Sequence, residues 1–258
     1  MKNFIMLNKR FFKKDIILFI LSFIVIIFVW KIISLVMDSE ILMPSPEKTF
    51  AGLIKIMTRN GFLSSVIHSI SRGILGFLIS FFAGMVFGVA AGFNKVLFKM
   101  MEPPMAIIKS IPLMSIILVA LIWFDSGNVP VFAGFLVSFP IVYTNVSEGI
   151  KNVDKKIIEM AKSYRIKKIR FLTEIYIPAI SPFIFSAAIS SMGIGWKAVI
   201  AAEVLSNPIK AIGTDMQLSR IYLQTDRVIA WTVIAVIISF IFETILRAVQ
   251  KKIIRWKT

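Results

Sequence analysis

Residues 67–92 read IHSISRGILGFLISFFAGMVFGVAAG, an apolar run in which Arg72 is the only formally charged residue. A helix rises 1.5 Å per residue, so this run is long enough to cross the roughly 30 Å hydrocarbon core of a bilayer. Gly84, Gly88 and Gly92 recur every four residues and share one helix face. Such a face lets another helix approach closely, and we expect packing within the chain rather than a dimer seam.

Five further apolar runs flank this one and predict an all-α membrane protein with six transmembrane helices. They occupy residues 15–37, 105–124, 129–149, 182–202 and 228–249. The third span contains Lys109 and Pro112, which predict a broken or kinked helix.

The first run could also be a secretory signal peptide, because Lys9, Arg10, Lys13 and Lys14 precede it. It is longer than the apolar core of a signal peptide, however, and no small-x-small cleavage site follows. We therefore expect a retained anchor. After the run, residues 46–57 have the spacing of a short amphipathic helix, which we expect to lie on the outer membrane surface.

Composition supports lipid as the solvent of this chain. Of its 258 residues 57% are hydrophobic and 17% charged, and the formal net charge is +16. The basic residues stand at the ends of apolar runs, where topology signals are found, rather than along a face that would read bases. We therefore expect a lipid bilayer as partner and no nucleic acid.

Several kinds of chemistry are excluded by what the sequence lacks. There is no cysteine, a single histidine (His68) and no GxxxxGK[ST] loop. Thiolate metal sites and nucleotide binding by a P-loop are thus ruled out. Any energy from ATP must enter through a partner.

The distribution of lysine and arginine predicts the orientation. Most of them lie before the first span, between spans two and three, in residues 151–178, and after the sixth span. The opposite side holds only a few basic residues: Lys48, Lys55, Arg59, Lys210, Arg220 and Arg227. The positive-inside rule therefore places both termini in the cytoplasm.

The longest hydrophilic stretch, residues 151–178, would then lie inside the cell. Apolar residues share one helical face at Ile157, Ile158 and Ala161, and another at Ile169, Leu172 and Ile175. Two short helices with a turn near residues 163–165 are expected. They could dock on a cytoplasmic protein, or the stretch could be a basic loop that only fixes topology.

The same stretch resembles the EAA motif of ABC importer permeases, which reads E-A-A-x3-G-x9-I-x-L-P. Here Glu159-Met160-Ala161 is followed by three residues, Arg165, nine residues, and 175–178 as I-Y-I-P. Met160 replaces an alanine of the motif and Arg165 replaces its glycine. Arginine is disfavoured if that position needs a left-handed backbone.

Other motifs extend the resemblance over nearly the whole chain, in the order expected for the nitrate/sulfonate/taurine-type branch. They are MPSP at 43–46, HSISRGILGF at 68–77, IPL at 111–113, LIWF at 121–124, WKAVIAAE at 196–203 and the region 213–227.

The resemblance implies a type I ABC importer permease: one permease domain over residues 1–258, with its core at 62–252, in the bacterial inner membrane. The implied partners are two ATP-binding subunits, a second copy of the chain and an extracytoplasmic substrate-binding protein. ATP and Mg would be bound by the ATPase, so this chain is no enzyme and needs no cofactor. The implied solute is small and anionic or zwitterionic: a sulfonate, nitrate, taurine or a pyrimidine precursor. The implied ATPase-coupling residues are Glu159, Met160, Ala161, Tyr164, Arg165, Ile175 and Pro178.

Charged residues within the spans have two interpretations, because a charge at mid-membrane faces the protein or a water path. Lys109, Lys197 and Glu203, with Ser115, could line a translocation pathway. Alternatively they form structural ion pairs, for example Lys109 with Glu203. A secondary transporter or channel without an ATPase is the alternative function, but neither repeated halves nor a polar ring within the spans is evident.

Overall fold

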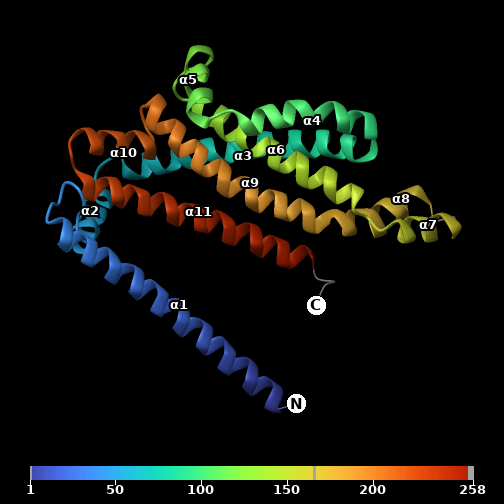
Figure 1. Cartoon of the computed structure of the whole chain (residues 1–258), viewed down its shortest axis with the longest axis horizontal. Helices are drawn as coiled ribbons and strands as arrows, with labels where there is room; N and C mark the ends of the chain where they lie inside the picture. Colours follow the sequence, from blue (N-terminus) through green and yellow to red (C-terminus); the bar gives the residue numbers. More distant parts are fainter. Residues whose placement is uncertain (1, 165–166, 255–258) are drawn as a thin grey trace. The chain divides into compact units, whose positions relative to one another are not determined.

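The computed structural model describes residues 2–164 and 167–254, and all the regular elements there are helical. Before the hydrophilic segment these are α1 (Lys2–Met37), α2 (Pro46–Met57), α3 (Phe62–Phe93), α4 (Lys95–Ser110), α5 (Leu113–Trp123) and α6 (Val129–Lys151). After them come α7 (Lys155–Ser163), α8 (Lys168–Arg170), the π-helix η1 (Phe171–Tyr176), α9 (Ile177–Ser206), α10 (Ile212–Ile221) and α11 (Thr225–Ile253). Figure 1 shows their order along the chain.

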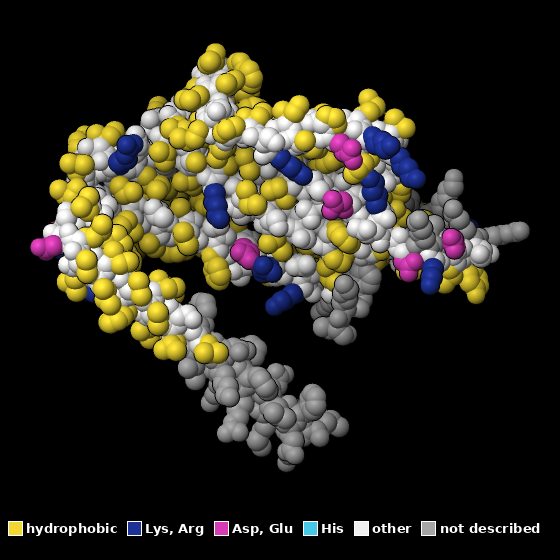
Figure 2. Space-filling view, viewed as in Figure 1, with side chains coloured by type: hydrophobic (Ala, Val, Ile, Leu, Met, Phe, Trp, Pro, Cys, Tyr) yellow, Lys and Arg dark blue, Asp and Glu magenta, His cyan; other side chains and the backbone are white. Residues whose placement is uncertain are grey.

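Among the described residues, five helices are long and apolar enough to cross a membrane, or six if α4 and α5 count as one bent span. The two meet at an angle of 97°. The break falls at Ile111 and Pro112, both of which are extended, because a proline disfavours helical geometry in the residue before it. The predicted break in the third span is thus confirmed. Apolar side chains cover much of the face in Figure 2, as expected for helices in lipid.

The chain forms two compact units. The first contains the residues up to Asn60 together with Leu218–Thr232, and the second contains Gly61–Gln217 together with the residues from Val233 onwards. In the first, the end of α1 is tied to the start of α2. Trp30 Nε1 donates to the Pro44 carbonyl (3.1 Å), and Lys31 Nζ lies 2.8 Å from Glu47 Oε1. This hydrogen-bonded ion pair lowers the pKa of Glu47 to about 2.

The predicted helix at 46–57 is confirmed with those bounds. Ser45 caps it by accepting from the Lys48 amide, and Pro46 occupies the first turn, where no amide hydrogen is needed. Its position on the membrane surface stays a prediction, as does a single domain over residues 1–258.

The centre of the second unit is made by α3, α6 and α9, which lie side by side (Figure 1). The glycine face of α3 packs on α6. A Cβ on Gly84 would lie 2.6 Å from Val142 Cβ, and one on Gly88 would lie 2.9 Å from Val146 Cβ. Gly92 meets Ile150 in the same way. The predicted packing within the chain is confirmed.

Small residues also bring α6 against α9. Gly134 contacts Val199, Gly149 contacts Phe183, and Ser138 Oγ donates to the Ser191 carbonyl (3.0 Å). The buried Trp196 of α9 lies on Gly73 of α3 and donates from Nε1 to the Ala235 carbonyl of α11 (2.9 Å). These close contacts build the frame that holds the polar residues described next.

Candidate functional site

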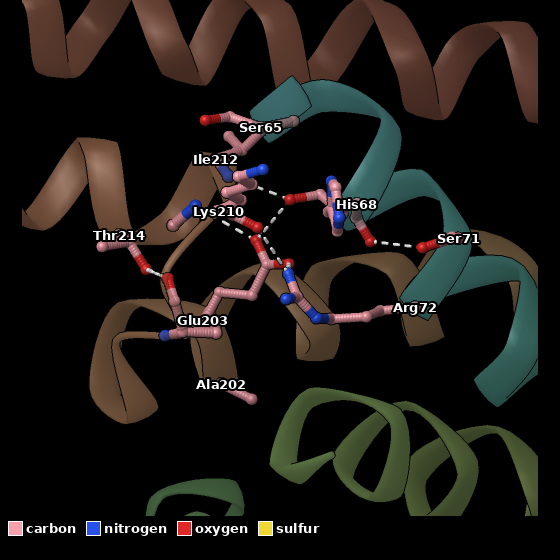
Figure 3. A network of polar contacts seen from close by, with 12 residues as sticks. Ser65, His68, Ser71, Arg72, Ala202, Glu203, Lys210, Ile212 and Thr214 are labelled. Carbon is pink, nitrogen blue, oxygen red and sulfur yellow. Dashed lines mark hydrogen bonds and ion pairs between the residues drawn. The ribbon is translucent and has the colours of Figure 1, made fainter. Parts of the chain in front are cut away.

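A buried polar cluster surrounds the carboxylate of Glu203, three residues before the end of α9. The side chain has no exposed surface. Its Oε1 accepts from Arg72 Nη1 (3.0 Å), while Oε2 accepts from Ser69 Oγ (2.7 Å) and from the Gly213 amide (3.1 Å) (Figure 3). A buried carboxylate is tolerated only when paired and hydrogen-bonded in this way.

The cluster fixes the connection from α9 to α10. Ser69 Oγ accepts from the Ile212 amide (2.9 Å), so Ser69 and Glu203 take up the first two amides of α10. A negative charge at a helix N-terminus is favourable. Arg72 Nη1 also donates to the Lys210 carbonyl (2.9 Å; Figure 3). The segment between the two helices is thereby tied to α3.

Gly213 is required at this position because α10 passes very close to α9. A Cβ there would lie 2.5 Å from Glu203 Cβ and 2.7 Å from the Val204 amide nitrogen. One helical turn before Ser69, Ser65 Oγ of α3 donates to Asp215 Oδ2 (2.7 Å). The hydroxyls of Ser65 and Ser69 on α3 thus both form hydrogen bonds at the start of α10.

Glu203 forms an ion pair, but its partner is not the suggested Lys109, and its predicted place in a translocation pathway stays a prediction. Glu203 pairs with Arg72, whereas Lys109 Nζ of α4 donates to Thr144 Oγ1 of α6 (3.0 Å). Ser69 was missed by the sequence analysis. Its spacing of three residues from Arg72, on one face of an apolar helix, is the signal that could have found it.

The other predicted pathway residues are exposed. Lys109 lies on α4, Ser115 on α5 and Lys197 on α9. In the described part of the chain, no hydrogen bond or ion pair joins any two of these three, or any of them to Glu203. Their pathway role therefore stays a prediction.

The predicted coupling residues divide into buried and exposed ones. On α7, Ala161 is buried while Glu159 and Met160 are exposed, and Tyr164 directly after the helix is 77% exposed. Arg165 lies outside the described residues. Ile175 and Pro178 are partly buried. Glu159 and Met160 on α7, with Tyr164 directly after it, are thus available to another protein.

The second short helix of this segment differs from expectation, because α8, η1 and α9 follow one another without a break. Pro178 lacks an amide hydrogen, so a regular helix could not satisfy the Glu174 carbonyl, and a π-helix ends just before it. Tyr176 fastens this stretch, since its hydroxyl donates to the Ile150 carbonyl at the end of α6 (3.2 Å). Movement of residues 168–176 would therefore reach α9 directly.

Comparison with known proteins identifies similar chains. The model of the family described as binding-protein-dependent transport system inner membrane component matches residues 76–255, more than half of the sequence. A Bacillus subtilis protein assigned as an aliphatic sulfonate transport permease, SsuC, is 26% identical over 90% of this chain and 85% of its own.

Two further relatives come from other organisms. The taurine transport system permease protein TauC of Escherichia coli is 24% identical over 88% of this chain and 84% of its own. The bicarbonate transport system permease protein CmpB of Synechococcus elongatus is 27% identical over 66% of this chain and 68% of its own.

Proposed function

This chain belongs to the binding-protein-dependent transport system inner membrane component family, and we propose that it carries a small anionic or zwitterionic solute into the cell. It is the inner-membrane permease subunit of an ABC importer and not an enzyme. An ATPase and a substrate-binding protein are its partners. We further propose that the importer contains two copies of this chain and two ATPase subunits, and that both termini of the chain lie in the cytoplasm.

The observation that carries the coupling proposal is the surface of α7. In a chain with no P-loop, an exposed helix next to the α6–α9 bundle presents Glu159, Met160 and Tyr164. Exposed apolar side chains rimmed by polar ones mark interaction sites. We propose that this surface docks on the ATPase, and that η1 passes the movement of the docked segment to α9.

Charge reversal tests this docking. The chain is co-expressed with its ATPase, with and without Glu159→Arg, and the complex is extracted in detergent. Wild type should retain the ATPase and Glu159→Arg should lose it. The matched control is Glu243→Arg, on an exposed glutamate of α11 that pairs with Arg247. Retention of the ATPase by Glu159→Arg, loss of the complex with both variants, or no association in wild type would contradict the proposal.

For the solute, the names of the relatives support a small anion or zwitterion. The assigned substrates are sulfonates, taurine and bicarbonate. We propose that Lys109 and Lys197, with Ser115, line the pathway, since an exposed ammonium attracts an anion without holding it tightly. Glu203 would support the wall of that pathway from within the bundle.

Solute uptake into proteoliposomes tests the pathway lysines. Lys109→Gln and Lys197→Gln should raise the solute concentration needed for half-maximal uptake, while assembly with the ATPase is unchanged. A secondary transporter would instead take up solute in the absence of ATP.

A further inference from the structure

A pocket of about 390 Å³ lies within the first unit, where the residues that follow α1, one face of α2 and the start of α11 meet. Pockets of this volume hold small organic molecules. None of the predicted pathway or coupling residues lines it. The pocket is therefore separate from the site described above.

Two contacts fix the walls of this pocket. Thr225 Oγ1 at the start of α11 donates to the Ile41 carbonyl (2.6 Å), which joins α11 to the segment after α1. Gly52 lets α11 approach α2, since a Cβ there would lie 3.1 Å from Asp226 Oδ2 and 3.5 Å from the Asp226 carbonyl carbon. The Asp226 carboxylate thus lies against the backbone of α2 and lines the pocket.

The charges of the pocket follow one face of α2. Lys48, Gly52 and Lys55 all line it and stand three or four residues apart, so they share that face. Because Asp226 lies at Gly52, its carboxylate comes between the two lysines. Residues 52 and 55 are about one helical turn, roughly 5 Å, apart along α2.

Only one of the two lysines has a counter-charge bound to it. Lys48 pairs with Glu40, which also lines the pocket. In the described part of the chain, neither Lys55 nor Asp226 forms an ion pair. One free ammonium and one free carboxylate therefore face the same pocket about a helical turn apart.

This arrangement selects for a ligand that carries both charges. A simple anion would be attracted by Lys55 but would also meet Asp226, and a simple cation would meet the reverse. Like charges placed close together are costly. An ammonium donates three hydrogen bonds and a carboxylate only accepts, so a molecule with an acid group and an amino group can satisfy both residues at once.

We propose that this pocket binds a small zwitterion, whose acid group pairs with Lys55 and whose ammonium pairs with Asp226. The two charges of the ligand are joined by a short spacer, as in a short amino acid or an amino sulfonate. Of the solute classes proposed above, the pocket suits the zwitterions and not the simple anions. Lys48 and Lys55 are among the few basic residues expected outside the cell, but the binding itself rests neither on that orientation nor on the transport function.

Equilibrium binding of radiolabelled β-alanine to the full-length chain in neutral detergent tests the proposal. Wild type should bind one β-alanine per chain saturably, and unlabelled taurine should compete. Propionate, which lacks the ammonium, and ethylamine, which lacks the acid group, should compete at least tenfold more weakly. Competition by propionate as strong as that by taurine would overturn the proposal.

Two variants remove one charge each. Lys55→Gln and Asp226→Asn should each weaken the binding of β-alanine about tenfold, because each removes one charge-assisted contact. Lys55→Arg keeps the charge and should lose less. Lys55 is exposed, so its replacement should leave the fold intact, and gel filtration shows whether each variant is folded.

Glu243→Gln is the matched control for Asp226→Asn, since it neutralises an exposed acid of the same helix that does not line the pocket. It should change the affinity less than about twofold. Absence of saturable binding in wild type, or equal losses in Glu243→Gln and Asp226→Asn, would overturn the proposal. So would binding that is lost in Lys109→Gln but kept in Asp226→Asn, because the ligand would then lie in the pathway.

No ATPase and no ATP are present in this measurement. A failed coupling test would therefore leave its result unaffected, and a failed binding test would leave the transport function standing.

Discussion

Arg72 Nη1 of α3 lies 3.0 Å from Glu203 Oε1 at the far end of α9, so residues 131 positions apart in sequence share one buried ion pair. The Arg72 side chain keeps 14% of its surface exposed, and Glu203 keeps none. The pair is completed by the amide of Gly213 and the hydroxyl of Ser69. This arrangement allows a direct test of what holds α10 in place.

Glu203→Gln should lower the free energy of unfolding by about 3 kcal/mol, because removal of one partner leaves the other charge buried and unpaired. Unfolding in mixed detergent, followed by circular dichroism, measures the change. The exposed Glu243, paired with Arg247, provides the control: Glu243→Gln should cost less than about 1 kcal/mol. The double variant Arg72→Gln/Glu203→Gln should be more stable than the sum of the two single changes predicts, and simple additivity would contradict the pairing.

Gly88→Ala should destabilise the bundle by about 1–3 kcal/mol, because the new methyl would lie 2.9 Å from Val146 Cβ and 3.1 Å from the Tyr143 carbonyl. The control is Gly193→Ala in α9, where a Cβ would have no neighbour within 4 Å. That change should be neutral or slightly stabilising, since alanine is the better helix former. Equal effects of both changes in the same unfolding assay would mean that α3 and α6 are not in close contact.

Trp196→Phe should cost about 1 kcal/mol for the lost hydrogen bond to the Ala235 carbonyl, in addition to any loss of packing on Gly73. Hydrogen exchange around residues 233–242 should increase, because this bond ties α11 to α9. Trp123 is 66% exposed, and Trp123→Phe should leave the exchange unchanged. Protection that is identical in all three proteins would contradict the contact.

Glu47 should remain ionised to a pH of about 2, whereas an ordinary carboxyl group of this type has a pKa of 4.5. A depressed pKa stabilises the folded state above the unfolded value of 4.5, and this contribution disappears as the pH falls from there towards 2. Carboxyl carbon NMR of the labelled protein measures the midpoint. Lys31→Gln removes the main cause and should return the midpoint towards 4.5, and a wild-type midpoint already near 4.5 would contradict the ion pair.

Met160→Asp should reduce the stimulated ATP hydrolysis of the assembled importer by about tenfold or more. It should not destabilise the permease itself, because the Met160 side chain is 49% exposed. Burial of a charge in an otherwise apolar contact is costly. The buried neighbour Ala161 offers a contrast: Ala161→Asp should instead impair folding. ATP hydrolysis in proteoliposomes and the yield of folded protein together distinguish the two effects. Full stimulation with Met160→Asp would mean that α7 does not touch the ATPase.

The sequence by itself determined the membrane class, the approximate places of the long helices, the break at Pro112 and the helix at 46–57. Each of these follows from a local cause: apolar length against the thickness of a bilayer, a proline without an amide hydrogen, or the amphipathic spacing of a short helix. The glycine spacing in 84–92 likewise indicated which face of α3 packs closely.

Only the tertiary structure decided which partners those faces and charges meet. Glu203 pairs with Arg72 instead of Lys109, and Trp196 reaches the Ala235 carbonyl, because helix packing sets which side chains lie within 3 Å of each other. One pocket is lined by Lys55 and Arg59 of α2 and the loop after it together with Arg227 of α11, which stands more than 160 positions later in the chain. Sequence spacing specifies neighbours within one helix, whereas contacts between helices depend on the crossing of all of them together.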